Sequence, residues 1–423
     1  MIKILLEAPI LTQSGYGEHA RLVYRALKLN TDIDLYVNPL DWGATSWASS
    51  MEEHLRESIN KDIESLGKYI NESQALNQPP KFDVQIHVGI PNEFEKKAQY
   101  SICVTAGIET DRVSVEWLIK THSGIDKLIV PSEHARTGFE STSYEAFNEK
   151  TKEKTMIDCA SKIEVVPYPV KEVQPKNLDF KTDTEFNFLC VSLLGPRKNM
   201  ENMIYWFMKE FKNENVGLIV KTGRVKGTPM DLESTIEHLK KVTSSEKDRK
   251  CKVYLLHGDL EESEIHSLYL REDVHAYVSC THGEGYGLPI FEAAYSGMPI
   301  VATDWSAHIE FLQAPYKEGG KTKNKKLFAK VDYDLSEIPQ HAVWEKILIK
   351  GSKWAYPKEQ SFRKQIRNMY KNHGMYKKWA KTLKSHIIET HENEKIVKQM
   401  SESIFSDINM SNAQNTEEDF LIL

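Results

Sequence analysis

Along this chain, short apolar runs typical of strands alternate with segments whose apolar residues recur at helical spacing. Residues 2–6 and 33–37 are short apolar runs typical of buried strands, and residues 19–29 between them repeat apolar positions at helical spacing. Residues 186–193 and 216–220 are further apolar runs that predict strands. Because strands that alternate with helices favour parallel sheets, we expect an α/β fold.

The most informative stretch is a strand, a glycine-rich loop and a helix. Residues 274–279 predict a buried strand, residues 280–288 form the loop, and Pro289 suits the first position of a helix that ends at Gly297. A further strand follows at residues 300–303. Such a loop leaves backbone N–H groups at the positive end of a helix, which favours an anion such as a phosphate.

Two glutamates flank this loop, Glu284 within it and Glu292 in the opening turn of the predicted helix. Ionised carboxylates only accept hydrogen bonds, so they suit a ligand that carries hydroxyls beside its phosphates, such as a nucleotide sugar. Glu292 would accept from the ribose and Glu284 from the transferred sugar. Taken singly, each feature is equally an ordinary turn or a charge that complements a helix dipole, but together they favour a ligand site. The predicted contacts to the diphosphate are the amides of Gly285, Tyr286, Gly287 and Leu288.

The segment Glu284-Gly-Tyr-Gly-Leu-Pro-Ile-Phe-Glu292, continued by Gly297-Met-Pro-Ile-Val-Ala-Thr-Asp304, resembles a known motif. It is similar to the glutamate-seven-residue-glutamate motif of retaining, GT-B-fold glycosyltransferases of the large family four. The resemblance covers most of residues 1–312. It implies two facing Rossmann-like domains with a donor cleft between them. It also implies transfer of a hexose with retention at the anomeric carbon and without an enzymic nucleophile.

The resemblance extends to two further loops. Gly15 and Gly17, after the first strand, match a glycine-rich loop that contacts the donor's diphosphate and sugar. Lys198, after the strand at residues 186–193, matches a lysine that contacts the diphosphate, and Arg197 is the candidate substitute for an upstream arginine that this chain lacks. A solvated basic turn is the alternative interpretation of this pair. A cation is nevertheless required near a leaving diphosphate.

The chain departs from the family on the acceptor side. Many relatives carry a histidine after the strand that corresponds to residues 101–105, whereas this chain has Glu109 there. Glu109 and Asp111 are therefore candidates for contact with the acceptor, without an assigned catalytic role.

The length of 423 residues exceeds what one ordinary core supports and predicts two domains of roughly 170 to 210 residues each. We expect an N-terminal Rossmann-like, acceptor-side domain at residues 1–170 and a C-terminal, nucleotide-sugar-binding domain at residues 171–374. By resemblance, residues 375–423 would supply helices that cross back to the first domain, followed by a polar tail.

Composition indicates a reduced compartment. The five cysteines are odd in number, widely spaced and free of a C-x-x-C pair. No run approaches the ~18 to 20 apolar residues that a membrane helix needs, and the chain enters a strand without a signal peptide. We therefore expect a cytoplasmic protein without a transmembrane segment, in the host cytoplasm if a phage encodes it.

Charge is distributed unevenly. Residues 317–384 hold 16 lysines and two arginines against six acidic residues, although the whole chain has a formal charge of −6. A solvated face is one interpretation, and a polyanionic partner such as duplex DNA or an anionic lipid surface is the other. The lysine-rich stretch and the loops Ser14-Gly-Tyr-Gly17 and Glu109-Thr-Asp-Arg112 are similar to those of phage-encoded members of the family, some of which glucosylate modified bases in DNA. The basic patch that we single out consists of Lys321, Lys323, Lys325 and Lys326.

The acceptor and some other functions stay open at this stage. The acceptor is either a hydroxymethylated base in DNA or a glycan or lipid of the cell envelope, and UDP-glucose is the expected donor. No phosphate-binding G-x-x-x-x-G-K-[ST] motif is present, and the D-x-D triplets at residues 32–34 and 332–334 lie beside strands. We therefore expect neither a metal nor a cofactor. The alternatives are a GT-B-fold epimerase or phosphorylase and a non-catalytic protein that binds nucleotide sugars or nucleic acid.

Overall fold

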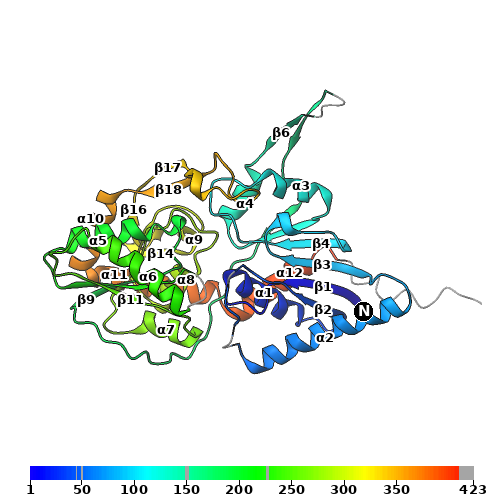
Figure 1. The fold of residues 1–423 in the computed structure, drawn as a ribbon, viewed down its shortest axis with the longest axis horizontal. Coiled ribbons are helices and arrows are strands. Elements are labelled where there is room, and N and C mark those ends of the chain that lie inside the picture. Colours follow the sequence, from blue (N-terminus) through cyan, green and yellow to red (C-terminus); the bar gives the residue numbers. More distant parts are fainter. Residues whose placement is uncertain (44, 49–50, 148–151, 225–227, 409–423) are drawn as a thin grey trace, which may run out of the picture. The chain divides into compact units, whose positions relative to one another are not determined.

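The computed structural model describes all of residues 1–423 except 44, 49–50, 148–151, 225–227 and 409–423. The chain divides into two units, each built on a six-stranded parallel sheet (Figure 1). The first unit comprises Met1–Gly107, Val113–Pro169 and Asn393–Leu423, and the second comprises Ile108–Arg112 and Val170–Glu392. The predicted α/β class with two Rossmann-like domains is confirmed.

The sheet of the first unit has the order β2-β1-β3-β4-β5-β8. Alternate side chains of the first strand, among them Ile4 and Leu6, face a buried core that helices cover, as strand periodicity predicts. The strands are β1 (Ile2–Ala8), β2 (Ile33–Pro39), β3 (Phe82–Val88), β4 (Ala98–Val104), β5 (Lys127–Val130) and β8 (Lys162–Val165). The helices are α1 (Gly15–Leu27), α2 (Glu53–Ala75), α3 (Val115–Ser123), α4 (Glu133–Glu140) and α12 (Asn393–Phe405), with the short η1 (Pro91–Glu93).

An antiparallel hairpin of β6 (Tyr144–Phe147) and β7 (Lys154–Ile157) projects from the first unit beyond α3 and α4 (Figure 1).

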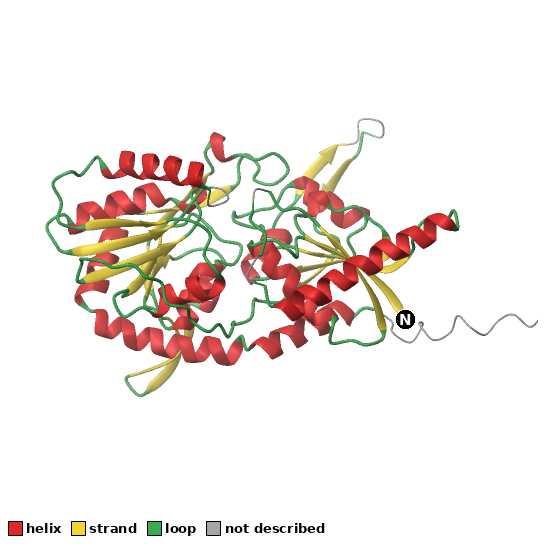
Figure 2. Ribbon diagram, turned by 60° about the horizontal axis from the view of Figure 1, so that its bottom comes forward, coloured by secondary structure: helices red, strands yellow, loops and turns green. Residues whose placement is uncertain are grey.

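The sheet of the second unit has the order β11-β10-β9-β12-β13-β16. Its strands are nearly continuous apolar runs because helices pack on the sheet, as in a doubly wound fold (Figure 2). The strands are β9 (Phe186–Val191), β10 (Val216–Lys221), β11 (Lys252–Leu256), β12 (Ala276–Ser279), β13 (Ile300–Thr303) and β16 (Ala329–Val331).

The helices of the second unit follow its strands. They are α5 (Met200–Phe211), α6 (Pro229–Thr243), α7 (Glu262–Leu270), α8 (Leu288–Ser296), α9 (His308–Phe311), α10 (Glu359–Lys371) and α11 (His373–Thr390), with the short η2 (Pro196–Lys198) and η3 (Gln340–Ala342). Two antiparallel hairpins complete the unit, β14 (Gln313–Glu318) with β15 (Lys321–Lys326) and β17 (Tyr333–Glu337) with β18 (Lys353–Pro357). In the described part of the chain, no helix combines the length and the apolar character that crossing a membrane requires.

Strand order locates the ligand edge of the second sheet. From β9 the chain builds outward to β10 and β11, and then crosses to β12 on the other side of β9. In open parallel sheets, ligands bind beyond the carboxyl ends of the strands at this point of reversal. The loops that follow β9 and β12 therefore meet where a ligand is expected. These loops carry Arg197, Lys198 and Glu284.

Candidate active site

The loop after β12 turns sharply into α8. Gly287 has a φ of +93°, a left-handed conformation that glycine adopts without strain, and α8 begins at the next residue. Pro289 lies in the first turn, where its missing N–H costs nothing, and Gly297 ends the helix with a φ of +91°. The predicted strand, loop and helix are thus present, with backbone N–H groups at the start of α8.

Gly283 permits a close approach of two backbone segments. A Cβ atom at this position would lie 2.2 Å from the carbonyl oxygen of Glu109 and 2.8 Å from the Trp305 ring. The segment Ile108–Arg112, which belongs to the second unit, therefore packs directly on the glycine-rich loop. This packing brings the Glu109 side chain to the site.

The loop after β9 is fixed by Asn199, which adopts a left-handed conformation with a φ of +51°. Asparagine tolerates this region better than most side chains. Its side-chain amide donates to the carbonyl of Cys280 (3.2 Å), and the backbone N–H of His282 donates to the carbonyl of Arg197 (2.8 Å). These bonds hold Arg197 and Lys198 against the loop that carries Glu284.

Four charged side chains meet at this edge of the second sheet. Lys198 Nζ lies 2.6 Å from Glu284 Oε1, and Arg197 Nη1 lies 2.9 Å from Glu284 Oε2. Arg197 also contacts Glu109 through Nη2, at 2.7 Å from Oε1. Two cations are thereby balanced by two carboxylates, in side chains that are at most about one-quarter exposed.

The cluster shifts the ionisation of its members. Burial alone would raise the pKa of Glu284, but the adjacent Arg197 and Lys198 outweigh it and hold the pKa well below the usual range. Burial, assisted by the neighbouring Glu284 carboxylate, raises the pKa of Glu109 against the effect of Arg197. Burial and the Arg197 charge lower the pKa of Lys198. Such opposed shifts within one cluster are typical of functional sites.

Two hydroxyl residues that the sequence did not single out support Glu284. The backbone N–H of Glu284 donates to Ser306 Oγ at 2.9 Å, and Thr281 Oγ1 donates to the carbonyl of Gly283 at 3.1 Å. Ser306 has a φ of +77°, which is strained for a residue other than glycine. Its place in Asp304-Trp-Ser306, just after the motif, was the only signal in the sequence that pointed to it.

Glu292 lies one turn deeper in the helix than expected. Because α8 begins at Leu288, Glu292 is its fifth residue and lies in the second turn, so its expected place in the opening turn is wrong. Its Oε2 accepts a hydrogen bond from Tyr269 Oη of α7 at 3.0 Å. Tyr286 is a core residue, 6% exposed, with its ring against Phe291 and Phe311, so only its backbone is suited to contact a ligand.

Gly15 and Gly17 lie in the first unit, where they open α1. Ser14 Oγ caps this helix by accepting from the Gly17 N–H at 3.0 Å, and a Cβ atom at Gly17 would lie 2.1 Å from the Thr12 carbonyl oxygen. Tyr168 Oη donates to the Gly15 carbonyl at 3.2 Å. Gly17 therefore allows a tight turn after the carboxyl end of β1.

Asp111 forms a hydrogen bond with the β17–β18 hairpin of the second unit. Its Oδ1 accepts from the backbone N–H of Lys353 on β18 at 2.6 Å, and Oδ2 lies 3.8 Å from Arg112. Asp111 thereby fastens its segment to the β17–β18 hairpin, beside Glu109 in the sequence.

The basic patch lies on β15. Lys325 lies 3.1 Å from Glu318 and over the Trp379 ring of α11 at 4.8 Å, and Lys326 lies 2.5 Å from Asp304. Two of its four lysines are thus neutralised within the unit. Lys321 and Lys323 are exposed, and no ion pair joins either of them to another described residue.

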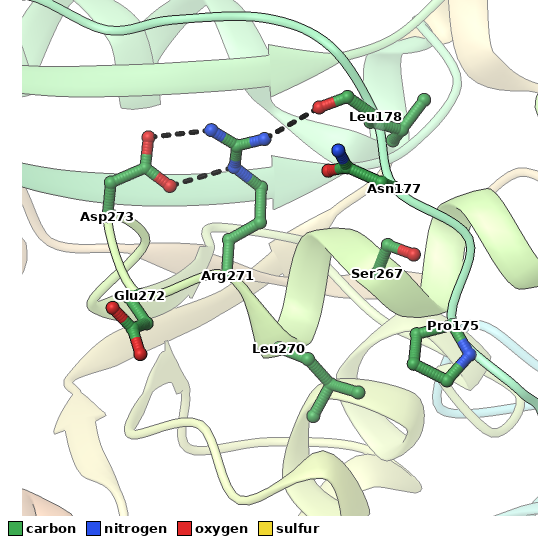
Figure 3. Close-up of a pocket in the computed structure, with 8 residues that line it drawn as sticks. All are labelled: Pro175, Asn177, Leu178, Ser267, Leu270, Arg271, Glu272 and Asp273. Carbon is green, nitrogen blue, oxygen red and sulfur yellow. Dashed lines mark hydrogen bonds and ion pairs between the residues drawn. The ribbon is translucent and has the colours of Figure 1, made fainter.

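A separate hollow of about 560 Å³ lies on the second unit (Figure 3). Arg271 beside it is held by Asp273 and by the carbonyl of Leu178. Its residues precede β9 and β12, so the hollow lies at the amino ends of the strands, opposite to the charged cluster. It is lined by Pro175, Asn177, Leu178, Ser267, Leu270, Arg271, Glu272 and Asp273.

Solved structures of glycosyltransferases share this architecture over nearly the whole chain. The chain is similar to HepE from Anabaena in complex with UDP and glucose, with 12% identity, a TM-score of 0.56, and coverage of 96% of this chain and 100% of that one. The fold is GT-B. A sucrose-phosphate synthase from Thermosynechococcus elongatus gives 14% identity, a TM-score of 0.59, and coverage of 96% and 99%. The lipopolysaccharide outer core galactosyltransferase WaaB in its apo form gives 14% identity, a TM-score of 0.53, and coverage of 96% and 100%.

Sequence comparison does not assign the chain to a family. No protein-family model and no curated protein matches the chain. At 12 to 14% identity, the likeness to solved structures establishes the GT-B fold. Function must therefore be argued from the charged cluster and the loop beside it.

Proposed function

We propose that this protein is a retaining glycosyltransferase that moves a hexose, glucose in the first instance, from a nucleotide-diphosphate sugar to a hydroxyl acceptor. The observation that carries the proposal is the cluster of Arg197, Lys198, Glu284 and Glu109 beside the N-terminus of α8, at the point of strand reversal. HepE, which has the same fold, was solved with UDP and glucose, and this supports UDP-glucose as the donor.

The cluster is suited to exchange partners when a donor binds. Without a ligand, Lys198 and Arg197 are neutralised by Glu284 and Glu109. A diphosphate brings negative charge to the same cations and to the N–H groups at the start of α8. Glu284 is then released to accept hydrogen bonds from sugar hydroxyls, and Glu292 accepts from the ribose.

The transfer step needs charge stabilisation on the leaving group. The bond between the anomeric carbon and the diphosphate oxygen breaks, and a bond from that carbon to the acceptor oxygen forms on the same face. The acceptor's proton passes to the departing diphosphate, so no enzymic nucleophile is involved. Lys198 and Arg197 stabilise the charge that develops on the diphosphate, without a metal ion in this proposal. Glu109, which forms an ion pair with Arg197, contacts the acceptor.

For the acceptor we propose a hydroxymethylated base in duplex DNA. The support is the exposed pair Lys321 and Lys323 on β15, within a stretch of 68 residues that carries a large excess of lysine. Phosphate backbones attract such lysines. A cell-envelope glycan or lipid is the alternative acceptor, and acceptor assays distinguish the two directly.

The proposal is tested by a donor screen with the wild-type chain and the Lys198→Ala variant. We expect calorimetry to detect UDP-glucose binding, and NMR of the product to show a retained anomeric configuration. Lys198→Ala should slow transfer by about a hundredfold at saturating donor, because one preorganised cation is lost from the leaving group. Lys212→Ala, which removes an exposed lysine paired with Glu246, is the matched control. Absence of binding by any nucleotide sugar would refute the proposal, and turnover without an acceptor would indicate an epimerase.

A further inference from the structure

Glu109 shares its one described cation with a second carboxylate. Its Oε1 lies 2.7 Å from Arg197 Nη2, and within the described part of the chain no other side chain forms an ion pair with Glu109. Arg197 uses Nη1 for Glu284 Oε2, at 2.9 Å, and for the carbonyl of Gly283, at 2.6 Å. A single guanidinium therefore neutralises Glu109 and helps to neutralise Glu284.

The backbone around Glu109 is held in place from two sides. A Cβ atom at Gly283 would lie 2.2 Å from the Glu109 carbonyl oxygen, so the two backbone segments are in direct contact. Two residues further on, Asp111 accepts from the backbone N–H of Lys353 at 2.6 Å. The Glu109 side chain, which is 25% exposed, can rotate, but its backbone cannot carry it away from the cluster.

A donor that binds as proposed would leave this carboxylate without its cation. The charged groups that face Glu109 are Arg197 and Lys198, which the diphosphate would engage, and Glu284, which repels it. Because the backbone is fixed, the freed carboxylate stays beside Glu284 and the incoming diphosphate. Negative charges so close together in a partly buried site cannot all persist, and one of the carboxylates then takes up a proton.

The two carboxylates differ in how readily they accept that proton. Burial raises the pKa of Glu109 even with Arg197 in contact, and the neighbouring Glu284 adds to the effect. Arg197 and Lys198, by contrast, outweigh burial at Glu284 and hold its pKa well below the usual range. Glu109 is therefore the carboxylate that becomes neutral when the cations turn to another partner.

We infer that Glu109 is an internal counter-ion that the donor displaces: the diphosphate takes over Arg197, and the freed Glu109 carboxylate takes up a proton from solvent. An O–H bond forms at one carboxylate oxygen and no other bond changes. The neutral acid leaves Arg197 and Lys198 to the diphosphate, and it can both donate to and accept from an acceptor hydroxyl. This inference rests on the proposed function, because it requires that a nucleotide-diphosphate sugar binds at the cluster.

The closing experiment measures UDP-glucose binding by calorimetry between pH 5 and pH 8, for the wild type and for Glu109→Gln. UDP-glucose is the probe because its diphosphate, unlike that of free UDP, does not titrate in this range. Titrations in two buffers of different ionisation enthalpy count the protons taken up. We expect the wild type to take up a proton on binding, so that its affinity rises as the pH falls, by up to ~10-fold per pH unit. Glu109→Gln should lose both the proton and this dependence.

The two proteins should also differ in affinity. At pH 8 the ionised Glu109 competes with the donor for Arg197, so Glu109→Gln should bind UDP-glucose at least ~10-fold more tightly than the wild type. The difference should narrow towards pH 5, because protonation of the wild type also removes this competition. A merely structural role for Glu109 would produce neither the tighter binding nor its dependence on pH.

A control and a second variant complete the test. Glu185→Gln removes the same charge from an exposed residue of the same unit, and it should keep the wild-type pH dependence. If Glu109→Gln does not fold, Glu109→Ala takes its place with the same expected results. A wild-type affinity that does not change with pH would overturn the inference, as would proton uptake that persists in the Glu109 variant. Failure of the wild type to bind UDP-glucose or any other nucleotide sugar would instead refute the proposed function.

Discussion

Glu284 keeps its negative charge in a nearly buried place because Arg197 and Lys198 contact it from two sides. Its side chain is 9% exposed, so the charge would be costly without these partners. The two cations depend on Glu284 in the same way, since their only other carboxylate contact among the described residues is the one between Arg197 and Glu109. At this scale the site is a set of mutually dependent charges.

The dependence on Glu284 predicts a stability that changes with pH. The folded-state pKa of Glu284 is depressed, so its contribution is fully present above the ordinary pKa near 4.5 and is lost as the pH falls below it. We expect Glu284→Gln to lower the free energy of unfolding by about 3 kcal/mol at pH 7, because two cations lose a partner. The gap should narrow progressively as the pH falls below about 4.5 towards the strongly depressed pKa of folded Glu284, because the unfolded wild-type chain takes up a proton in this range while the folded chain does not.

Urea denaturation of both proteins at a series of pH values measures this gap. Glu185→Gln is the matched control, because it removes the same charge from an exposed residue. A gap that stays constant from pH 7 to pH 3 would contradict the assignment of the charges.

Among the elements, the final helix α12 is held to the first unit by a buried lysine. Lys127 of β5 is fully buried, and its Nζ donates to the carbonyl of Ser403 at 2.6 Å and to Ser406 Oγ at 2.8 Å. Asp407 lies 2.6 Å from the same amine. The amine thus satisfies carbonyl and carboxylate groups at the C-terminal end of α12, where a cation also complements the helix dipole.

Replacing this lysine should loosen the helix. We expect Lys127→Met to lower the free energy of unfolding by about 3 kcal/mol, because a buried ion pair loses one partner. Limited proteolysis should also cleave within α12 faster than in the wild type. Lys162→Met is the matched control: Lys162 is half-exposed and pairs with the same Asp407, so its replacement should destabilise the protein much less than that of Lys127. If both variants lost the same free energy of unfolding, burial of the Lys127 amine would make no contribution to stability.

The whole chain has a formal charge of −6, yet residues 317–384 carry a net +12. The remaining residues are therefore strongly acidic, and a polyanion would be attracted to one stretch and repelled by the others. Part of that positive charge is already neutralised, as the contacts of Lys325 and Lys326 show. The free part is carried by residues such as Lys321 and Lys323.

If duplex DNA is the acceptor, its binding should depend steeply on salt. Raising the salt from 50 to 200 mM should weaken binding by a factor on the order of ten or more for each few phosphates contacted. The double variant Lys321→Glu, Lys323→Glu should lower the affinity and flatten this dependence. Binding can be followed by fluorescence anisotropy, with Lys240→Glu, Lys241→Glu on α6 as a control of equal charge change. Affinity for DNA that responds to neither salt nor the lysines would redirect the search to a glycan or lipid acceptor.

Much of the site could be predicted because it is encoded locally. The strand, glycine-rich loop and helix around Glu284 and the basic turn at Lys198 follow from patterns a few residues long. Local patterns could not reveal that the segment Ile108–Arg112 belongs to the second unit, nor that Glu109 contacts Arg197. Those contacts join residues about ninety positions apart, and no periodicity reports them.

The sequence by itself determined the α/β class, the order of strands and helices, and the presence of a glycine-rich loop before α8. These properties depend on side-chain periodicity and on the backbone freedom of single residues such as Gly287. Only the tertiary structure decided which charges neutralise one another, that Lys127 anchors α12, and that Tyr286 is a core residue. Such properties depend on contacts and burial, which arise only after distant segments of the chain have packed together.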